Sequence, residues 1–145
     1  EENDSVFREE VPPGAKSGIP KHEPAPADTP WRHTHRANEV SLFRFSALTF
    51  NGHRIHYDRP YAMQVEGYPG LVVHGPYSST LLLNFARDHN PGRTMTSFQM
   101  RARAPLFDTA PVTLVGRPEP DGTTSSLWSL TPEGTIAMSA TATFA

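Results

Sequence analysis

The stretch GPYSSTLLLNFARDHNPG, residues 75–92, decides the fold because it has the length and boundaries of one long amphipathic helix. A Gly-Pro pair opens it, and proline is favoured in the first turn of a helix. Tyr77, Leu81 and Phe85 recur at helical spacing before an Asn-Pro-Gly run ends the pattern. Since one face of this helix is apolar, we expect it to pack against a sheet.

The chain downstream of this helix supplies that sheet. Two of its segments alternate apolar and polar side chains, and two are short apolar runs, as expected of strands. The segments are 98–104, Val112–Val115, Leu127–Leu130 and Ile136–Phe144. Turn residues fill Pro118–Gly122 and Pro132–Gly134. One helix followed by four strands predicts an α+β domain in which a largely antiparallel sheet wraps the helix.

Two further elements are expected upstream of the long helix. Val40, Leu42 and the Phe43-Arg44-Phe45 run alternate in a way that predicts a first strand. Asp58, followed by Arg59-Pro60, has the residue types of a helix cap and first turn, so we predict a short helix that ends near Gly67.

The first 30 residues differ in composition from the rest. They hold six of the 15 prolines and seven acids against three bases, with almost no apolar periodicity. We therefore expect residues 1–30 to be a tether or linker and residues 31–145 to be the folded domain. The run Ser5–Arg8 resembles the end of a strand, as if another domain preceded it.

Composition excludes several classes of function. The formal net charge of -2 does not indicate a general nucleic-acid-binding protein. The absence of cysteine excludes disulfides, a thiol nucleophile and cysteine-ligated metals. Apolar runs such as Leu81–Leu83 are far shorter than the roughly 20 residues of a membrane-spanning helix. We expect a soluble protein of the cytoplasm, or of the mitochondrial matrix in a eukaryote.

The densest polar cluster is residues 51–58, NGHRIHYD, between the predicted first strand and the short helix. A neutral histidine is a general base near pH 7, and a neighbouring amide can hold a water molecule. His56 is the best-placed candidate, with Asn51 as the amide. A hydrogen-bonded structural histidine is the alternative that this octapeptide leaves open.

A second motif, residues 70–76, is an apolar run that reaches glycine where the long helix begins. Free N–H groups and the positive end of the helix dipole converge at such a place. They are suited to an oxygen that gains negative charge, and Gly75 lets a substrate approach the main chain closely. An ordinary glycine and proline helix start is the simpler interpretation.

Together the motifs resemble a known family. Phe45–Asp58, FSALTFNGHRIHYD, followed 12 residues later by Gly70–Gly75, is similar to the hydratase signature of MaoC-like hot-dog enzymes. Within that family, the sequences of Phe43–Asn51 and His53–Asp58 resemble those of the branch that contains mesaconyl-CoA and itaconyl-CoA hydratases and mitochondrial 3-hydroxyacyl-thioester dehydratase. The resemblance extends from Glu39 to the C-terminus and is specific over Phe43–Gly75.

This resemblance implies a hot-dog fold, a long helix wrapped by a curved antiparallel sheet, and reversible addition of water to an enoyl-CoA, of which the dicarboxylic mesaconyl-CoA and itaconyl-CoA are examples. It implies no metal or redox cofactor, since coenzyme A is part of the substrate. His56 falls on the family's catalytic histidine and Gly75 on the glycine whose N–H binds the thioester oxygen. The family's aspartate is Asn51 here, and an amide cannot accept a proton from water.

Other residues are candidates for substrate binding around these three. They are Val73, His74, Tyr57, Arg54 and Arg101. An arginine here could pair with coenzyme A phosphates or with a second carboxylate, although each could equally belong to a solvated face. A zinc site built from histidines is disfavoured because no acidic partner is evident and the resemblance explains His56 without metal.

Two rival functions remain at this point. A hot-dog thioesterase would use a carboxylate, for which Asp58 is available, and a non-catalytic acyl-binding subunit would explain Asn51 as lost catalysis. Because a hot-dog sheet leaves an edge and an apolar face uncovered, we expect a second hot-dog domain as partner, in a homodimer or a hetero-complex. Neither nucleic acid nor membrane is an expected partner.

Overall fold

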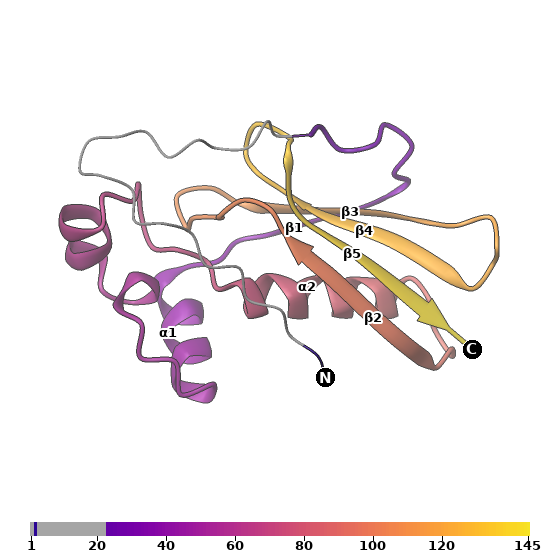
Figure 1. The fold of residues 1–145 in the computed structure, drawn as a ribbon, viewed down its shortest axis with the longest axis horizontal. Coiled ribbons are helices and arrows are strands. Elements are labelled where there is room, and N and C mark those ends of the chain that lie inside the picture. The colour runs from indigo at the N-terminus through magenta and orange to yellow at the C-terminus, as the bar shows by residue number, and fades with distance from the viewer. Residues whose placement is uncertain (1, 3–22) are drawn as a thin grey trace.

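The computed structural model describes Glu2 and residues 23–145, which form one five-stranded sheet and two α-helices (Figure 1). The elements, in chain order, are β1 (Trp31–His35), α1 (Glu39–Leu48), the 3₁₀ turn η1 (Arg54–His56), the π-helical turn η2 (Tyr61–Val65), α2 (Gly75–Asp88), β2 (Met95–Ala102), β3 (Val112–Pro118), β4 (Thr124–Leu130) and β5 (Ile136–Phe144). The strand order is β1-β3-β4-β5-β2, and every neighbouring pair is antiparallel. The α+β prediction is therefore confirmed.

Helix α2 lies across one face of the sheet and forms the core with it (Figure 1). Its Leu82, Phe85 and Ala86 are buried, whereas Tyr77 and Leu81 of the predicted apolar face are half-buried against the same core. The sheet side of the core includes Leu114, Leu127, Ala140, Ala142 and Phe144. Full burial of one such leucine or phenylalanine contributes about 1.5–3 kcal/mol, so this contact fixes where the start of α2 lies relative to the sheet.

The predicted strand over Val40–Phe45 is wrong, because these residues belong to α1. Asn38 caps this helix: its side chain accepts from Ser41 N at 2.9 Å, and Ser41 Oγ accepts from Asn38 N at 3.0 Å. Buried Leu42 and Ser46 are four residues apart on one helical face. The capping box overrides the local alternation that favoured a strand.

Strand β1 is an element that the sequence did not predict. It pairs with β3 at the edge of the sheet, and its three central residues are exposed, so it carries no apolar pattern. Trp31 is opposite Gly116, where an added Cβ would lie 3.1 Å from Trp31 Cε3 and 3.3 Å from Phe85 Cε1. Glycine at this position is what allows the two aromatic rings to approach β3.

The described part of the expected tether is attached to the domain. Ile136 N donates to Glu23 O at 2.9 Å, and Pro24 forms an isolated bridge with Thr135. Arg117 pairs with Asp28 farther along. The strand-like run Ser5–Arg8 lies outside the described residues, as does most of the region predicted to be a linker.

The segment Leu71–Val73, which leads into α2, is held on both sides. Val72 N donates to Ile55 O at 3.0 Å, and Val73 N donates to Leu106 O at 2.8 Å. The buried carboxylate of Asp108 accepts from Leu71 N at 2.9 Å. These bonds fix the backbone that joins η1 to the first residue of α2.

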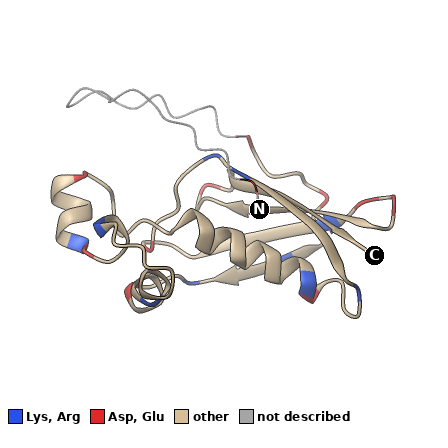
Figure 2. Cartoon of the chain, turned by 60° about the horizontal axis from the view of Figure 1, so that its bottom comes forward, with Lys and Arg blue, Asp and Glu red and all other residues tan. Residues whose placement is uncertain are grey.

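The predicted short helix is present as η2, and Asp58 Oδ1 accepts from Tyr61 N at 3.1 Å, as expected of a cap. Basic and acidic positions are interspersed over the fold, and the first turns of α2 carry none (Figure 2). Among the described residues, no helix is both long and apolar enough to cross a bilayer.

Candidate active site

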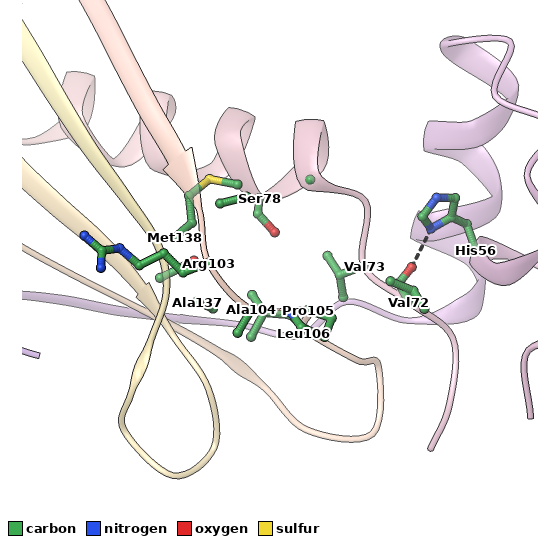
Figure 3. Close-up of a pocket in the computed structure, with 13 residues that line it drawn as sticks. His56, Val72, Val73, Ser78, Arg103, Ala104, Pro105, Leu106, Ala137 and Met138 are labelled. Carbon is green, nitrogen blue, oxygen red and sulfur yellow. Dashed lines mark hydrogen bonds between the residues drawn. The ribbon is translucent and has the colours of Figure 1, made fainter. Parts of the chain in front are cut away.

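A cavity of about 370 Å³ lies where η1, the start of α2 and the sheet meet. Most of its lining is apolar (Figure 3). The lining residues are His56, Val72, Val73, Gly75, Ser78, Ala102, Arg103, Ala104, Pro105, Leu106, Ser129, Ala137 and Met138. The volume is at the small end of ligand pockets, which span roughly 300–1,000 Å³.

His56 has one ring nitrogen fixed and the other free for chemistry. The residue is buried, and its Nδ1 lies 2.7 Å from the carbonyl oxygen of Val72 (Figure 3). A carbonyl only accepts, so Nδ1 carries the proton and the neutral ring has its lone pair on Nε2. That is the tautomer a general base requires.

The environment keeps this imidazole neutral. Burial lowers the pKa of His56 below 6.5, the hydrogen bond to Val72 partly opposes that effect, and His53 lowers the pKa further. The two rings of His53 and His56 meet edge to face at 5.6 Å. A depressed pKa leaves Nε2 unprotonated at neutral pH.

His74 lies behind His56 rather than in the cavity. Their rings stack with centroids 3.7 Å apart and planes at 18°. His74 Nε2 is 2.8 Å from Ser46 Oγ, and its Nδ1 is buried with no partner among the described residues. Burial, and secondarily the charge of His56, lowers the pKa of His74 to about 4. We infer that the His74 ring stays neutral and packs against the His56 ring, whereas the sequence suggested that His74 binds substrate.

Gly75 begins α2 on the cavity wall, at an N-terminus without a side-chain cap. The residue at the cap position is His74, whose ring is directed to Ser46 instead. Pro76 has no N–H, and the N–H of Gly75 is among those that a helix leaves without an internal partner. The start of α2 can therefore donate a hydrogen bond to an oxygen outside the helix, and the helix dipole strengthens that interaction.

Of the predicted site residues, His56, Val73 and Gly75 line the cavity. Asn51 does not line it; its Oδ1 accepts from His53 N at 3.0 Å in a local turn. Tyr57 donates to Gly52 O at 2.8 Å, again outside the cavity lining.

The two predicted arginines also lie elsewhere. Arg54 is exposed, bonded to Asp58 at 2.7 Å and stacked 4.1 Å from the ring centroid of Tyr61. Arg101 is exposed on β2, whereas Arg103, just past the end of that strand, contributes to the lining. Arg101 and Arg103 are two residues apart and would share one face of a strand, so the choice between them depends on where β2 ends, which the sequence does not show.

Sequence reasoning missed two serines that line the cavity. Ser78 lies in the first turn of α2, three residues after Gly75, so helical spacing was a usable signal. Ser129 is in β4 and reaches the cavity only through the pairing of β4 with β5, for which the sequence has no local signal.

The histidines do not assemble a metal site. Within Glu2 and residues 23–145, no three His, Cys, Asp or Glu side chains are placed to hold an ion together. His35 Nε2 instead lies 2.8 Å from the hydroxyl of Tyr77, and His33 is exposed on β1.

Comparison with known proteins identifies the family. The profile of the family described as Hydroxyacyl-thioester dehydratase type 2 matches residues 1–108. The chain belongs to this family. Mesaconyl-C(4)-CoA hydratase of Chloroflexus aurantiacus is 49% identical over 97% of this chain and 49% of its own length. The mitochondrial type 2 dehydratase of Schizosaccharomyces pombe is 39% identical over 50% of this chain and 25% of its own. The chain thus spans about half, or less, of the relatives it matches.

Solved structures confirm the hot-dog fold for this member of the type 2 family. The ChsH1-ChsH2 complex of Mycobacterium tuberculosis aligns at a TM-score of 0.67 with 18% identity, covering 79% of this chain and 92% of that one. An (R)-hydratase from A. caviae aligns at 0.65 with 20% identity, covering 77% and 89%. A long helix packed on a curved antiparallel sheet is common to these two structures and this chain.

His74 predicts a specific dependence of stability on pH. Its folded-state pKa of about 4 lies below 6.5, the ordinary value for histidine, so the unfolded chain takes up the proton first as pH falls. The free energy of unfolding should therefore lose about 3 kcal/mol from this group between pH 6.5 and 4. Denaturant melts of the wild type and His74→Phe across this range measure it.

The His74→Phe variant should lack this contribution to the pH dependence of the free energy of unfolding. The control His33→Asn, a change at an exposed histidine, should retain it. Equal slopes in the wild type and His74→Phe would contradict the assignment of a buried neutral ring.

Proposed function

We propose that the protein catalyses reversible addition of water to the double bond of an enoyl thioester. The observation that carries this proposal is that His56, with a free Nε2, and Gly75, at an uncapped helix start, line the same cavity. One group suits a nucleophilic water and the other suits the acyl oxygen.

In the proposed hydration, the thioester oxygen accepts a hydrogen bond from Gly75 N–H. His56 Nε2 takes a proton as the water oxygen bonds to the β-carbon and the electron pair of the double bond moves toward the thioester, giving an enolate. The imidazolium then returns the proton to the α-carbon. Asn51 lies outside the cavity lining, where its Oδ1 accepts from His53 N, so no step is assigned to it. These steps use protein groups and water alone.

The substrate we propose is an acyl-CoA with a short chain, such as a dicarboxylic enoyl-CoA. Support comes from the 49% identity to mesaconyl-C(4)-CoA hydratase and from the cavity volume of about 370 Å³. A small cavity with mostly apolar walls suits a few carbon atoms rather than a long fatty chain.

The geometry favours hydration over thioester hydrolysis. The carboxylate available to a thioesterase, Asp58, is bound by Arg54 at 2.7 Å and by Tyr61 N, and the pKa of Asp58 is lowered chiefly by the Arg54 bond. Among the residues that line the cavity, none is Asp or Glu. A carboxylate nucleophile is therefore missing from this lining.

Replacement of His56 tests the function. His56→Ala should lower kcat/KM for hydration of crotonyl-CoA by about 10²- to 10⁴-fold, because the proton acceptor is lost. Loss of the conjugated double bond is followed by absorbance and release of free thiol is assayed in parallel.

His33→Ala is the matched control and should keep parental activity, while circular dichroism verifies that both variants are folded. Hydration by His56→Ala at near parental rate, or thiol release in place of hydration by the wild type, would rule out the proposal.

We further propose that a second hot-dog domain covers part of this one. Large apolar side chains are exposed around α1, with Leu48 at 80% and Phe50 at 96%. Strand β2 is an edge of the sheet, and its Met100 is 44% exposed. Exposed apolar groups and a free strand edge are each typical of an interface, and the first of the matched relatives is long enough to contain a second domain.

Association can be measured on the chain itself. Sedimentation at micromolar concentration should show a dimer, and Leu48→Glu combined with Phe50→Glu should shift it toward monomer by burying charge at the interface. Asn84→Glu, on the exposed side of α2, is the control. A wild type that stays monomeric would contradict self-association through this face.

A further inference from the structure

A buried hydroxyl without a partner identifies a polar end of the cavity. Ser129 is 0% exposed, and its Oγ has no hydrogen-bond partner among the described residues. Buried hydroxyls in folded proteins nearly always have a partner. Ser129 is also among the residues that line the cavity, so a molecule bound there is a candidate partner for this hydroxyl.

Ser129 lies away from the proposed reaction centre. It is paired with Met138 across the β4–β5 ladder, so the two side chains share a face of the sheet. Figure 3 shows Met138 and His56 at opposite ends of the group of lining residues. A ligand with its reacting carbons between His56 and Gly75 would direct the far end of its acyl group toward Ser129.

The polar groups around this cavity favour a hydrogen-bond acceptor, and a negative one. The Ser78 hydroxyl points from α2 toward the segment that carries Ala104 (Figure 3). Arg103 is the only charged residue of the lining, and none of the residues lining the cavity is acidic. A carboxylate there would meet donors and no like charge.

Arg103 itself is not directed at this end. Its guanidinium extends away from His56 and Ser78 (Figure 3) and pairs with Glu23 at 3.0 Å. The arginine therefore contributes positive potential at the edge of the cavity, while direct contact is left to the serines.

We propose that Ser129 is a specificity-determining residue whose hydroxyl donates to the distal carboxylate of a short dicarboxylic enoyl thioester. This inference rests on the proposed hydratase function and adds the residue that selects the acyl group. A site built to pair with a polar substrate group discriminates against an analogue that lacks it, because its own buried group is then left unpaired.

The test compares fumaryl-CoA with crotonyl-CoA, which differ by a carboxylate in place of a methyl group. The wild-type chain should favour fumaryl-CoA in kcat/KM. Ser129→Ala should lower kcat/KM for fumaryl-CoA by about 10- to 100-fold, the loss expected of a hydrogen bond to a charged group, and change crotonyl-CoA less than about 3-fold.

Ser125→Ala is the matched control. Ser125 is buried on the same face of β4, but it bonds to Asn90 and does not line the cavity, so its loss should leave the ratio of the two substrates unchanged. If Ser129→Ala does not fold, Ser129→Cys, with a weakly donating thiol, must show the same fall in the ratio.

The outcomes separate the two proposals. Hydration of crotonyl-CoA by the wild type with no preference for fumaryl-CoA, or a ratio that Ser129→Ala leaves unchanged, overturns the role of Ser129 alone. A folded wild type that hydrates neither substrate overturns the hydratase function and this inference with it.

Discussion

The hydrogen bond from His56 Nδ1–H to the carbonyl of Val72 is the interaction on which the proposed chemistry depends. It selects the tautomer that leaves Nε2 free, and it does so through backbone that is itself fixed. Val72 N donates back to Ile55 O, next to His56, and Val73 N donates to Leu106 O. A main-chain acceptor held by the fold cannot rotate away, so the ring keeps one orientation through each cycle of proton transfer.

The same segment carries the second half of the site. Two residues after Val72 the chain reaches His74, whose ring stacks on His56, and the next residue begins α2. Because the His74 ring is engaged with Ser46, it does not cap the helix, and the donor end of α2 stays open toward the cavity. Burial of two stacked imidazoles disfavours a positive charge on either ring, which keeps His56 neutral. The same burial lowers the stability of the folded protein in acid, where the unfolded chain can take up the protons.

The sequence was enough to predict the bounds of those helices and strands whose periodicity and terminal residues agree with the way they pack. Helix α2 and the strand β5 were predicted with nearly the observed bounds for that reason. It failed at α1, where a capping box outweighs an alternating run, and at β1, an exposed edge strand whose only determinant is pairing with β3. In the site, the order and spacing of the motif predicted His56 and Gly75, and the structure places both at one cavity. Ser129 could not be found, since only the sheet register brings it to the cavity.

The protonation state of the His56 ring in solution tests the proposed chemistry most directly. NMR of the imidazole nitrogens at neutral pH, in protein with isotopically labelled histidine, distinguishes a protonated from an unprotonated ring nitrogen, and His56→Gln assigns the signals. We predict a protonated Nδ1, an unprotonated Nε2 and a pKa below 6.5 for His56. A proton on Nε2 with Nδ1 bare, or a ring that remains charged at neutral pH, would contradict this prediction.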